Sequence, residues 1–224
     1  MPKLKKNVKF TKLAQKEEIE KIKELFLKHY PNSVTELNYK NTFELLIAVM
    51  LSAQCTDKRV NIITPELLKK YPTPHDLANA KLEDVKEIIK SCSFFNNKAK
   101  NLIAMAKMLV ENYGGKVPLE QKELVKLPGV GQKTANVVLI EATNANLMAV
   151  DTHVFRVAHR LGLSNKKTAL ETEKDLTKKF KTNLHQLHQA MVLFGRYTCK
   201  ATKPECDKCF LQEFCKSKES FKAR

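Results

Sequence analysis

The chain has 224 residues and carries 40 Lys and Arg against 24 Asp and Glu, a formal net charge of +16 at pH 7. This length allows one large or two small domains, and the charge favours nucleic acid, or less often an anionic membrane surface, as the partner. No run of 18 apolar residues occurs, so we expect neither a transmembrane helix nor a membrane partner.

The N-terminal stretch, residues 1–12, contains five lysines and no acidic residue. It lacks the apolar core of a secretory signal, so we expect a reduced, cytoplasmic protein, associated with the nucleoid if its source is bacterial. Two interpretations of this basic arm stay open: a flexible, solvated segment, or a segment that contacts DNA.

Apolar residues recur at helical spacing through most of the chain, and no segment alternates convincingly as a strand does. The pattern predicts an all-α fold. In chain order, the expected helices cover residues 19–26, 43–53, 102–110, about 132–140, 154–161 and 184–194. The second of these is nearly all apolar and should be buried.

A glycine hairpin precedes the expected helix at about residue 132, where Gly129 and Gly131 flank Val130. Glycine allows a tight turn, and the unpaired N–H groups at the start of the following helix can bind a phosphate. A Walker A loop would need lysine directly after the second glycine, but Gln132 stands there. Together with the positive charge, the motif favours DNA-backbone contacts through Gly129, Val130, Gly131 and Thr134 over a plain helix joint.

Lys133 lies beside this hairpin, and Asp151 precedes another helical run 18 residues later. A deprotonated lysine could attack a sugar carbon of a nucleic acid, and we expect partial burial and the positive end of its helix to favour loss of the proton. The carboxylate could accept that proton, or stabilise positive charge on the sugar. The alternatives are a phosphate contact for Lys133 and a helix N-cap for Asp151.

Four cysteines with 6-2-5 spacing crowd the C-terminal region: Cys199, Cys206, Cys209 and Cys215. This density of thiols in a reduced protein indicates a metal centre. Structural zinc sites usually show paired short spacings, so the uneven spacing favours an iron–sulfur cluster. The first loop carries Lys203 and could hold cations against phosphate. We expect Cys55 and Cys92 to be small, buried side chains.

Together these motifs resemble the endonuclease III family, bifunctional DNA glycosylases of the helix–hairpin–helix superfamily. The similarity extends from about residue 34 to residue 216. Its main segments are Leu51-Ser-Ala-Gln54, Leu127-Pro-Gly-Val-Gly131, Lys133-Thr-Ala-Asn136, Val150-Asp-Thr-His153, Gly195-Arg-Tyr-Thr-Cys199 and the cysteine spacing.

The resemblance implies two helical domains with the active site in the cleft between them. Residues 34–146 would form six helices, with the helix–hairpin–helix motif at about 121–140. Residues 1–33 and 147–224 would form the second domain, with a [4Fe–4S] cluster on loop 199–215. The implied partner is double-stranded DNA with a damaged base or an abasic site. We expect the enzyme itself to be a monomer.

The resemblance also implies residue roles. Lys133 would attack the sugar C1′ and expel an oxidised pyrimidine, with Asp151 as its acidic partner. β-Elimination from the Schiff base would then cut the strand 3′ to the abasic site. Gln54 would fill the gap left by the flipped nucleotide. Three further residues would lie near the substrate pocket, or else serve local hydrogen bonding and capping: Ser52, Asp57 and His153.

Two positions depart from the family pattern. Phe94 stands where the family often has an aliphatic wedge, although an aromatic ring can also intercalate beside bases. Glu205 places an acid in a cluster loop that is often more basic.

Three functions are alternatives to a glycosylase that acts on oxidised pyrimidines. The adenine-mispair branch lacks a lysine at position 133 and carries a further C-terminal domain, so Lys133 and the last residue, Arg224, speak against it. A pyrimidine-dimer glycosylase is closer. The non-enzymatic alternative is an iron–sulfur DNA-binding module.

Overall fold

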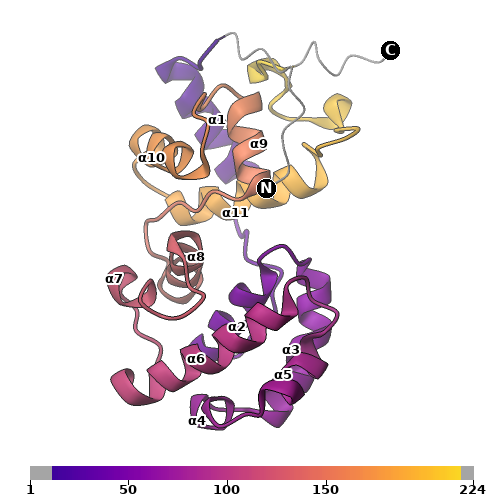
Figure 1. The fold of residues 1–224 in the computed structure, drawn as a ribbon. Helices are drawn as coiled ribbons and strands as arrows, with labels where there is room; N and C mark the ends of the chain where they lie inside the picture. Colours follow the sequence, from indigo (N-terminus) through magenta and orange to yellow (C-terminus); the bar gives the residue numbers. More distant parts are fainter. Residues whose placement is uncertain (1–11, 218–224) are drawn as a thin grey trace. The chain divides into compact units, whose positions relative to one another are not determined.

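The computed structural model describes residues 12–217, and the chain divides into two compact units (Figure 1). Unit 1 comprises Met1–Val34 and Asn146–Arg224, and unit 2 comprises Thr35–Ala145. All regular secondary structure within residues 12–217 is helical, so the predicted all-α class is confirmed. The basic arm, apart from Lys12, lies outside the described residues.

Unit 2 holds seven helical segments, of which α4 and α7 are about one turn long, where six helices were expected. Their bounds are α2 (Thr42–Ser52), α3 (Asp57–Lys70), α4 (Pro74–Ala78), α5 (Leu82–Ile89), α6 (Phe95–Tyr113), α7 (Gln121–Leu124) and α8 (Gln132–Thr143).

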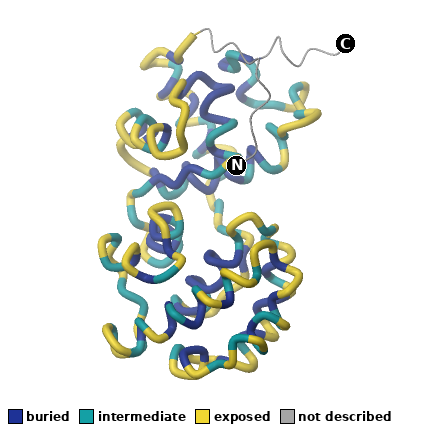
Figure 2. The backbone as a smooth tube through the Cα atoms, in the orientation of Figure 1, coloured by how far each residue is buried: buried dark blue, intermediate teal, exposed yellow. Residues whose placement is uncertain are grey.

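The centre of unit 2 is α2, which is buried almost all round, as its continuous apolar sequence predicts (Figure 2). The side chain of Asn41 caps its start by accepting a hydrogen bond from the Glu44 N–H at 3.0 Å. α3, α6 and α8 pack around it. α8, which begins at the glycine hairpin, is therefore anchored on the core of unit 2.

Unit 1 is built from both ends of the described chain. Its helices are α1 (Lys16–His29), α9 (Thr152–Arg160), α10 (Ala169–Phe180) and α11 (Leu184–Tyr197), followed by two short 3₁₀ helices, η1 (Cys206–Lys208) and η2 (Gln212–Phe214). α1 packs against α10 and α11, and α9 packs against the same two helices.

Aromatic rings join these parts of unit 1. The ring of Phe26 on α1 meets Phe194 of α11 edge to face at 5.4 Å, and Phe210 of the cysteine loop at 5.8 Å. Such pairs add specific geometry to the burial of apolar area. The cysteine loop therefore packs on a core that both α1 and α11 help to form.

All six helices expected from the apolar pattern are present, but the pattern did not predict five others, which are α3, α4, α5, α7 and α10. α3 contains Pro65 and α10 is highly charged, and both features weaken an apolar periodicity. No helix among residues 12–217 is long and apolar enough to cross a membrane.

Candidate functional site

The hairpin before α8 depends on one of its two glycines. Gly129 adopts φ +80°, and a Cβ added there would lie 2.8 Å from the Cβ of Asn101. Gly131 has an extended backbone (φ −90°, ψ 174°), and a Cβ there would meet open space. The turn and its close contact with α6 therefore require glycine at position 129 only.

Val130 shapes the hairpin from within. Its side chain is buried, and its N–H donates to the Leu127 carbonyl at 3.0 Å. Its side chain and N–H therefore serve the turn, although Val130 was predicted to contact DNA.

The N-terminus of α8 carries no side-chain cap. Gln132, Lys133 and Thr134 form its first turn, whose N–H groups are the usual donors to a bound anion. The buried Asn136 steadies this turn from below, because its side-chain oxygen accepts hydrogen bonds from Gln132 (3.3 Å) and from Gln121 of α7. These two hydrogen bonds tie α7 to the first turn of α8, on either side of the hairpin.

Lys133 is exposed, so the expected partial burial was wrong. Its position in the first turn of α8 is as predicted, and the positive end of the helix dipole still acts on it. The exposed amine is accessible to a substrate that approaches the hairpin.

Asp151 caps α9 in unit 1. Its Oδ1 accepts a hydrogen bond from the Val154 N–H at 2.7 Å, so this oxygen is the helix N-cap that the alternative interpretation predicted. This cap uses Oδ1 alone, and the side chain is only partly buried. One carboxylate oxygen can therefore hold the helix while the other acts in chemistry.

His153 lies in the first turn of the same helix, partly buried against α11. A Cβ on Gly195 would come within 2.9 Å of the His153 Cβ, so glycine allows this contact. Burial lowers the pKa of His153, and the nearby Asp151 charge opposes that shift. Arg156 Nη2 lies 3.2 Å from His153 Nδ1. Arginine can only donate, so this contact favours the tautomer that keeps a lone pair on Nδ1.

Gln54 and Phe94 occupy two turns of unit 2, after α2 and before α6. Both have left-handed backbones, with φ 56° and 59°, and both side chains are exposed; Phe94 is 62% exposed. Non-glycine residues rarely adopt this conformation, which persists only where the surroundings enforce it. Exposed side chains on an enforced backbone suit a surface that must enter another molecule.

Ser52 and Asp57 flank the Gln54 turn. The Ser52 hydroxyl donates to the Val49 carbonyl at 2.8 Å, a local bond within α2. Asp57 begins α3, but Thr56 caps that helix by accepting from the Arg59 N–H at 3.3 Å. Ser52 therefore makes the local hydrogen bond that was its alternative role. The residue that caps α3 is Thr56, next to Asp57.

The four predicted metal ligands line one cavity of unit 1: Cys199, Cys206, Cys209 and Cys215. Within residues 12–217, no three His, Cys, Asp or Glu side chains converge as they would around a single ion. Four thiols around a shared cavity instead fit a polynuclear cluster. Burial, reinforced by the other thiols, raises the pKa of Cys209 to about 11, so loading a cluster must release protons.

Arg160, at the end of α9, holds this loop. The buried guanidinium donates to the carbonyls of Lys200 (2.7 Å) and Ala201 (3.2 Å) and to Cys199 Sγ (3.2 Å). Its own carbonyl accepts from the Lys216 N–H at 2.8 Å. One residue therefore joins both ends of the cysteine loop to the helix that Asp151 caps.

Lys203 lies in the first cysteine loop, exposed and with a left-handed backbone (φ 51°). Glu205, the acid that departs from the family pattern, pairs with Lys200 at 2.6 Å. This pairing lowers the pKa of Glu205. The acid therefore offsets Lys200 and leaves the charge of Lys203 available.

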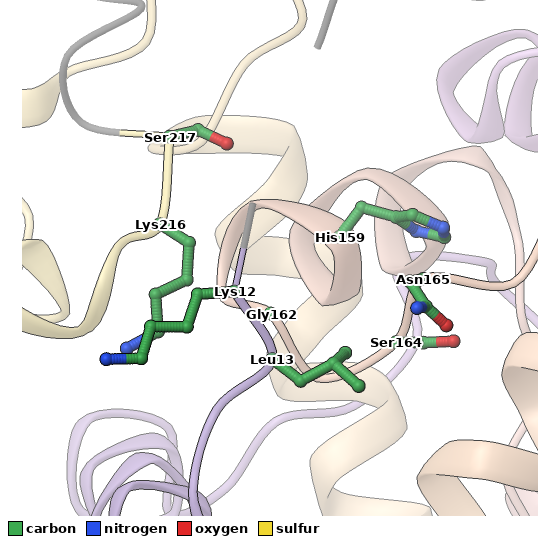
Figure 3. A pocket seen from close by; sticks show the side chains of 8 residues that line it. All are labelled: Lys12, Leu13, His159, Gly162, Ser164, Asn165, Lys216 and Ser217. Carbon is green, nitrogen blue, oxygen red and sulfur yellow. The ribbon is translucent and has the colours of Figure 1, made fainter. Parts of the chain in front are cut away.

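A second cavity of unit 1, about 210 Å³, contains none of the predicted site residues (Figure 3). It lies beside Gly162, and its lining includes Lys12 and Lys216. Lys216 forms an ion pair with Glu18 of α1. The cavity thus lies between the segment before α1, the end of α9 with the chain that follows it, and the chain after the last cysteine.

Sequence reasoning missed three residues: Lys98, Arg156 and Arg160. The two arginines stand four residues apart in an otherwise largely apolar helix, a pattern that could have indicated a shared polar target. Lys98 gave no comparable signal, because its partners are backbone carbonyls and a thiol. Cys92 is buried, as predicted, but Cys55, which was also predicted to be buried, is only partly buried.

Comparison with known proteins adds two family matches. Residues 47–182 match the HhH-GPD superfamily of base excision DNA repair proteins. Residues 199–215, which begin and end at predicted cluster ligands, match the iron-sulfur binding domain of endonuclease III.

Individual proteins are similar over most of the chain. Endonuclease III of Rickettsia conorii is 50% identical over 88% of this chain and 94% of that protein. Endonuclease III of Bacillus subtilis is 48% identical, with 84% and 86% covered. A solved structure of a trapped endonuclease III–DNA covalent intermediate superposes with a TM-score of 0.89 at 44% identity, covering 93% of this chain and 99% of that one.

The two hairpin glycines should respond differently to alanine. Gly129→Ala should lower the free energy of unfolding by about 2–3 kcal/mol, because alanine disfavours positive φ and its methyl would meet Asn101. Gly131→Ala should change it by less than about 0.5 kcal/mol. Urea denaturation measures both. Equal destabilisation by the two substitutions would contradict this division of roles.

Arg160→Met should weaken the cysteine loop. Partly buried carbonyls lose their donor, so we expect a loss of about 3 kcal/mol in unfolding free energy and faster bleaching of cluster absorbance in the presence of an iron chelator. Arg59→Met removes the same charge from an exposed site in unit 2 and serves as the control. Equal bleaching rates for the two variants would rule out an anchoring role.

Proposed function

Since the chain belongs to the endonuclease III family of base excision repair proteins, we propose that Lys133 is its nucleophile and Asp151 the acidic partner. The protein is a DNA glycosylase with AP lyase activity, and it carries a [4Fe–4S] cluster. The substrate proposed is double-stranded DNA that contains an oxidised pyrimidine or an abasic site.

The position of Lys133 carries this proposal. Its exposed amine stands in the first turn of an uncapped helix, beside a hairpin suited to hold a phosphate. A backbone phosphate bound there would bring a sugar of the same strand near the amine. The similar endonuclease III was trapped as a covalent intermediate with DNA, and a covalent bond requires a nucleophile of this kind.

The reaction follows from these two residues. The Lys133 amine attacks C1′ as the bond from C1′ to the damaged base breaks, and the base leaves. Asp151 accepts the proton that the amine loses, or stabilises positive charge on the sugar through Oδ2. The sugar ring opens to a Schiff base on Lys133. Loss of a proton from C2′ then breaks the bond from C3′ to O3′, which cuts the strand 3′ to the abasic site.

Other residues would prepare the substrate. We propose that Gln54 and Phe94 enter the duplex when the damaged nucleotide leaves the base stack. Burial lowers the pKa of His153, so we propose that the neutral ring donates its N–H to a carbonyl oxygen of the flipped base. Ser52 and Asp57 remain proposed pocket residues, and Thr134 and Gly131 proposed phosphate contacts.

The cluster ligands proposed are the four cysteines that line one cavity. When bound, the cluster would supply cross-linking of the loop rather than a step of the reaction. Arg160 then holds the loop to α9, and Lys203 projects from it as a cation for the DNA backbone.

Borohydride trapping tests the nucleophile. Wild-type protein incubated with duplex DNA containing thymine glycol should give a covalent adduct after reduction, and Lys133→Gln should give none. Lys122→Gln removes an exposed lysine of α7 and should trap as wild type does. An adduct of normal yield from Lys133→Gln would place the nucleophile elsewhere, and DNA binding with no adduct from any protein would favour a non-enzymatic binding module.

Asp151→Asn separates the two roles of the carboxylate. Asparagine is an equally good N-cap, so the unfolding free energy should change by less than about 0.5 kcal/mol. Base release, however, should slow about 100-fold, because the amide cannot accept the lysine proton. Single-turnover kinetics and thermal denaturation measure the two effects; unchanged base release would reduce Asp151 to a cap.

A further inference from the structure

Lys98, in the second turn of α6, makes an unusual set of hydrogen bonds. Its Nζ donates to the Leu51 carbonyl at 2.8 Å and to the Ala53 carbonyl at 2.7 Å. The third contact, at 3.1 Å, is to Cys92 Sγ. All three hydrogens of the ammonium group therefore have an acceptor within unit 2, and none of these acceptors is a carboxylate.

These acceptors belong to two separate turns. Leu51 and Ala53 lead into the Gln54 turn, which we define as residues 53–56. Cys92 belongs to the Phe94 turn, residues 90–94. The side chain of Lys98 therefore bridges the two exposed turns from beneath.

The two turns also touch each other directly. The Cys92 thiol donates to the Leu51 carbonyl at 3.3 Å. Burial, and then the nearby Cys92 thiol, raise the pKa of Cys55. A thiol is a weak hydrogen-bonding partner. The ammonium of Lys98 supplies the strong, charge-assisted bonds at this junction.

The end of α2 depends on the same group. A helix leaves its last carbonyls without partners and presents a partial negative charge there. Lys98 satisfies two carbonyls at this end and places a positive charge beside it. The chain then passes directly into the left-handed backbone of Gln54, while Phe94 has a left-handed backbone on the other turn.

We propose that Lys98 is a positioning residue that holds the Gln54 and Phe94 turns in one fixed arrangement, so that both side chains enter DNA together. This inference rests on the proposed role of Gln54 and Phe94 as DNA contacts. The donors of Lys98 are used within the protein, so its loss affects engagement of damaged DNA rather than general attraction to the DNA backbone.

The test compares two methionine variants. Lys98→Met keeps the aliphatic stem and removes the ammonium, and Lys107→Met removes the same charge from an exposed position of the same helix. Binding is measured to a duplex with a stable abasic-site analogue and to the intact duplex. We expect Lys98→Met to lose about tenfold in affinity for the abasic duplex, and less than about twofold for the intact one. Lys107→Met should keep the wild-type ratio.

A base-analogue reporter separates positioning from a general loss of stability. With 2-aminopurine opposite the abasic site, insertion by the wild type should change its fluorescence, and Lys98→Met should reduce that change even with saturating protein. A folded Lys98→Met protein with the wild-type affinity ratio and the wild-type fluorescence change overturns the proposal.

Hydrogen exchange in the wild-type protein gives a test that needs no variant. If Lys98 joins the turns, abasic DNA should slow amide exchange in residues 53–56 and 90–94 together; protection of one turn alone overturns the proposal. Borohydride trapping by the same wild-type sample tests the role of Lys133 separately from that of Lys98. Absence of an adduct would count against Lys133 as the nucleophile and would leave these binding comparisons intact.

Discussion

The left-handed turn at Gly129 is the constraint on which the proposed chemistry of unit 2 depends. It brings the hairpin backbone so close to Asn101 of α6 that a Cβ would not fit, and it directs the chain into α8 without a side-chain cap. The uncapped first turn can then receive a phosphate, and it presents Lys133 there. Because α8 packs on the buried α2, the position of the lysine is fixed by the core and not by a flexible loop.

In unit 1, α9 fixes the positions of Asp151 and of the cysteine loop. Asp151 caps its first turn, and Arg160 closes its last turn by holding both ends of the cysteine loop. Arg156, between them, contacts His153 and also donates to the Cys199 carbonyl at 2.9 Å. A helix is stiff over so short a length, so the acid and the cluster loop share one rigid support. Perturbing the loop should therefore alter the setting of the acid.

The sequence predicted what local patterns encode. Apolar periodicity indicated the helices, and glycine spacing indicated the hairpin. It could not predict the exposure of Lys133, because burial depends on packing that no local pattern records. Nor could it assign one glycine to the turn: Gly129 and Gly131 look alike in sequence and differ only in backbone conformation. Lys98 was missed for a similar reason. Its partners are backbone carbonyls far away in the sequence, and every residue type has such a carbonyl.

Backbone strain connects the proposed DNA contacts. Family resemblance and charge indicate Gln54, Phe94 and Lys203, and each has a left-handed backbone that most side chains avoid. A residue kept there at an energetic cost needs surroundings that enforce it, and Lys98 and the Lys200–Glu205 pair lie beside these turns. A rigid, exposed tip loses less conformational freedom on entering DNA than a flexible one. The strain is therefore understood best as a cost in folding that lowers the cost of binding.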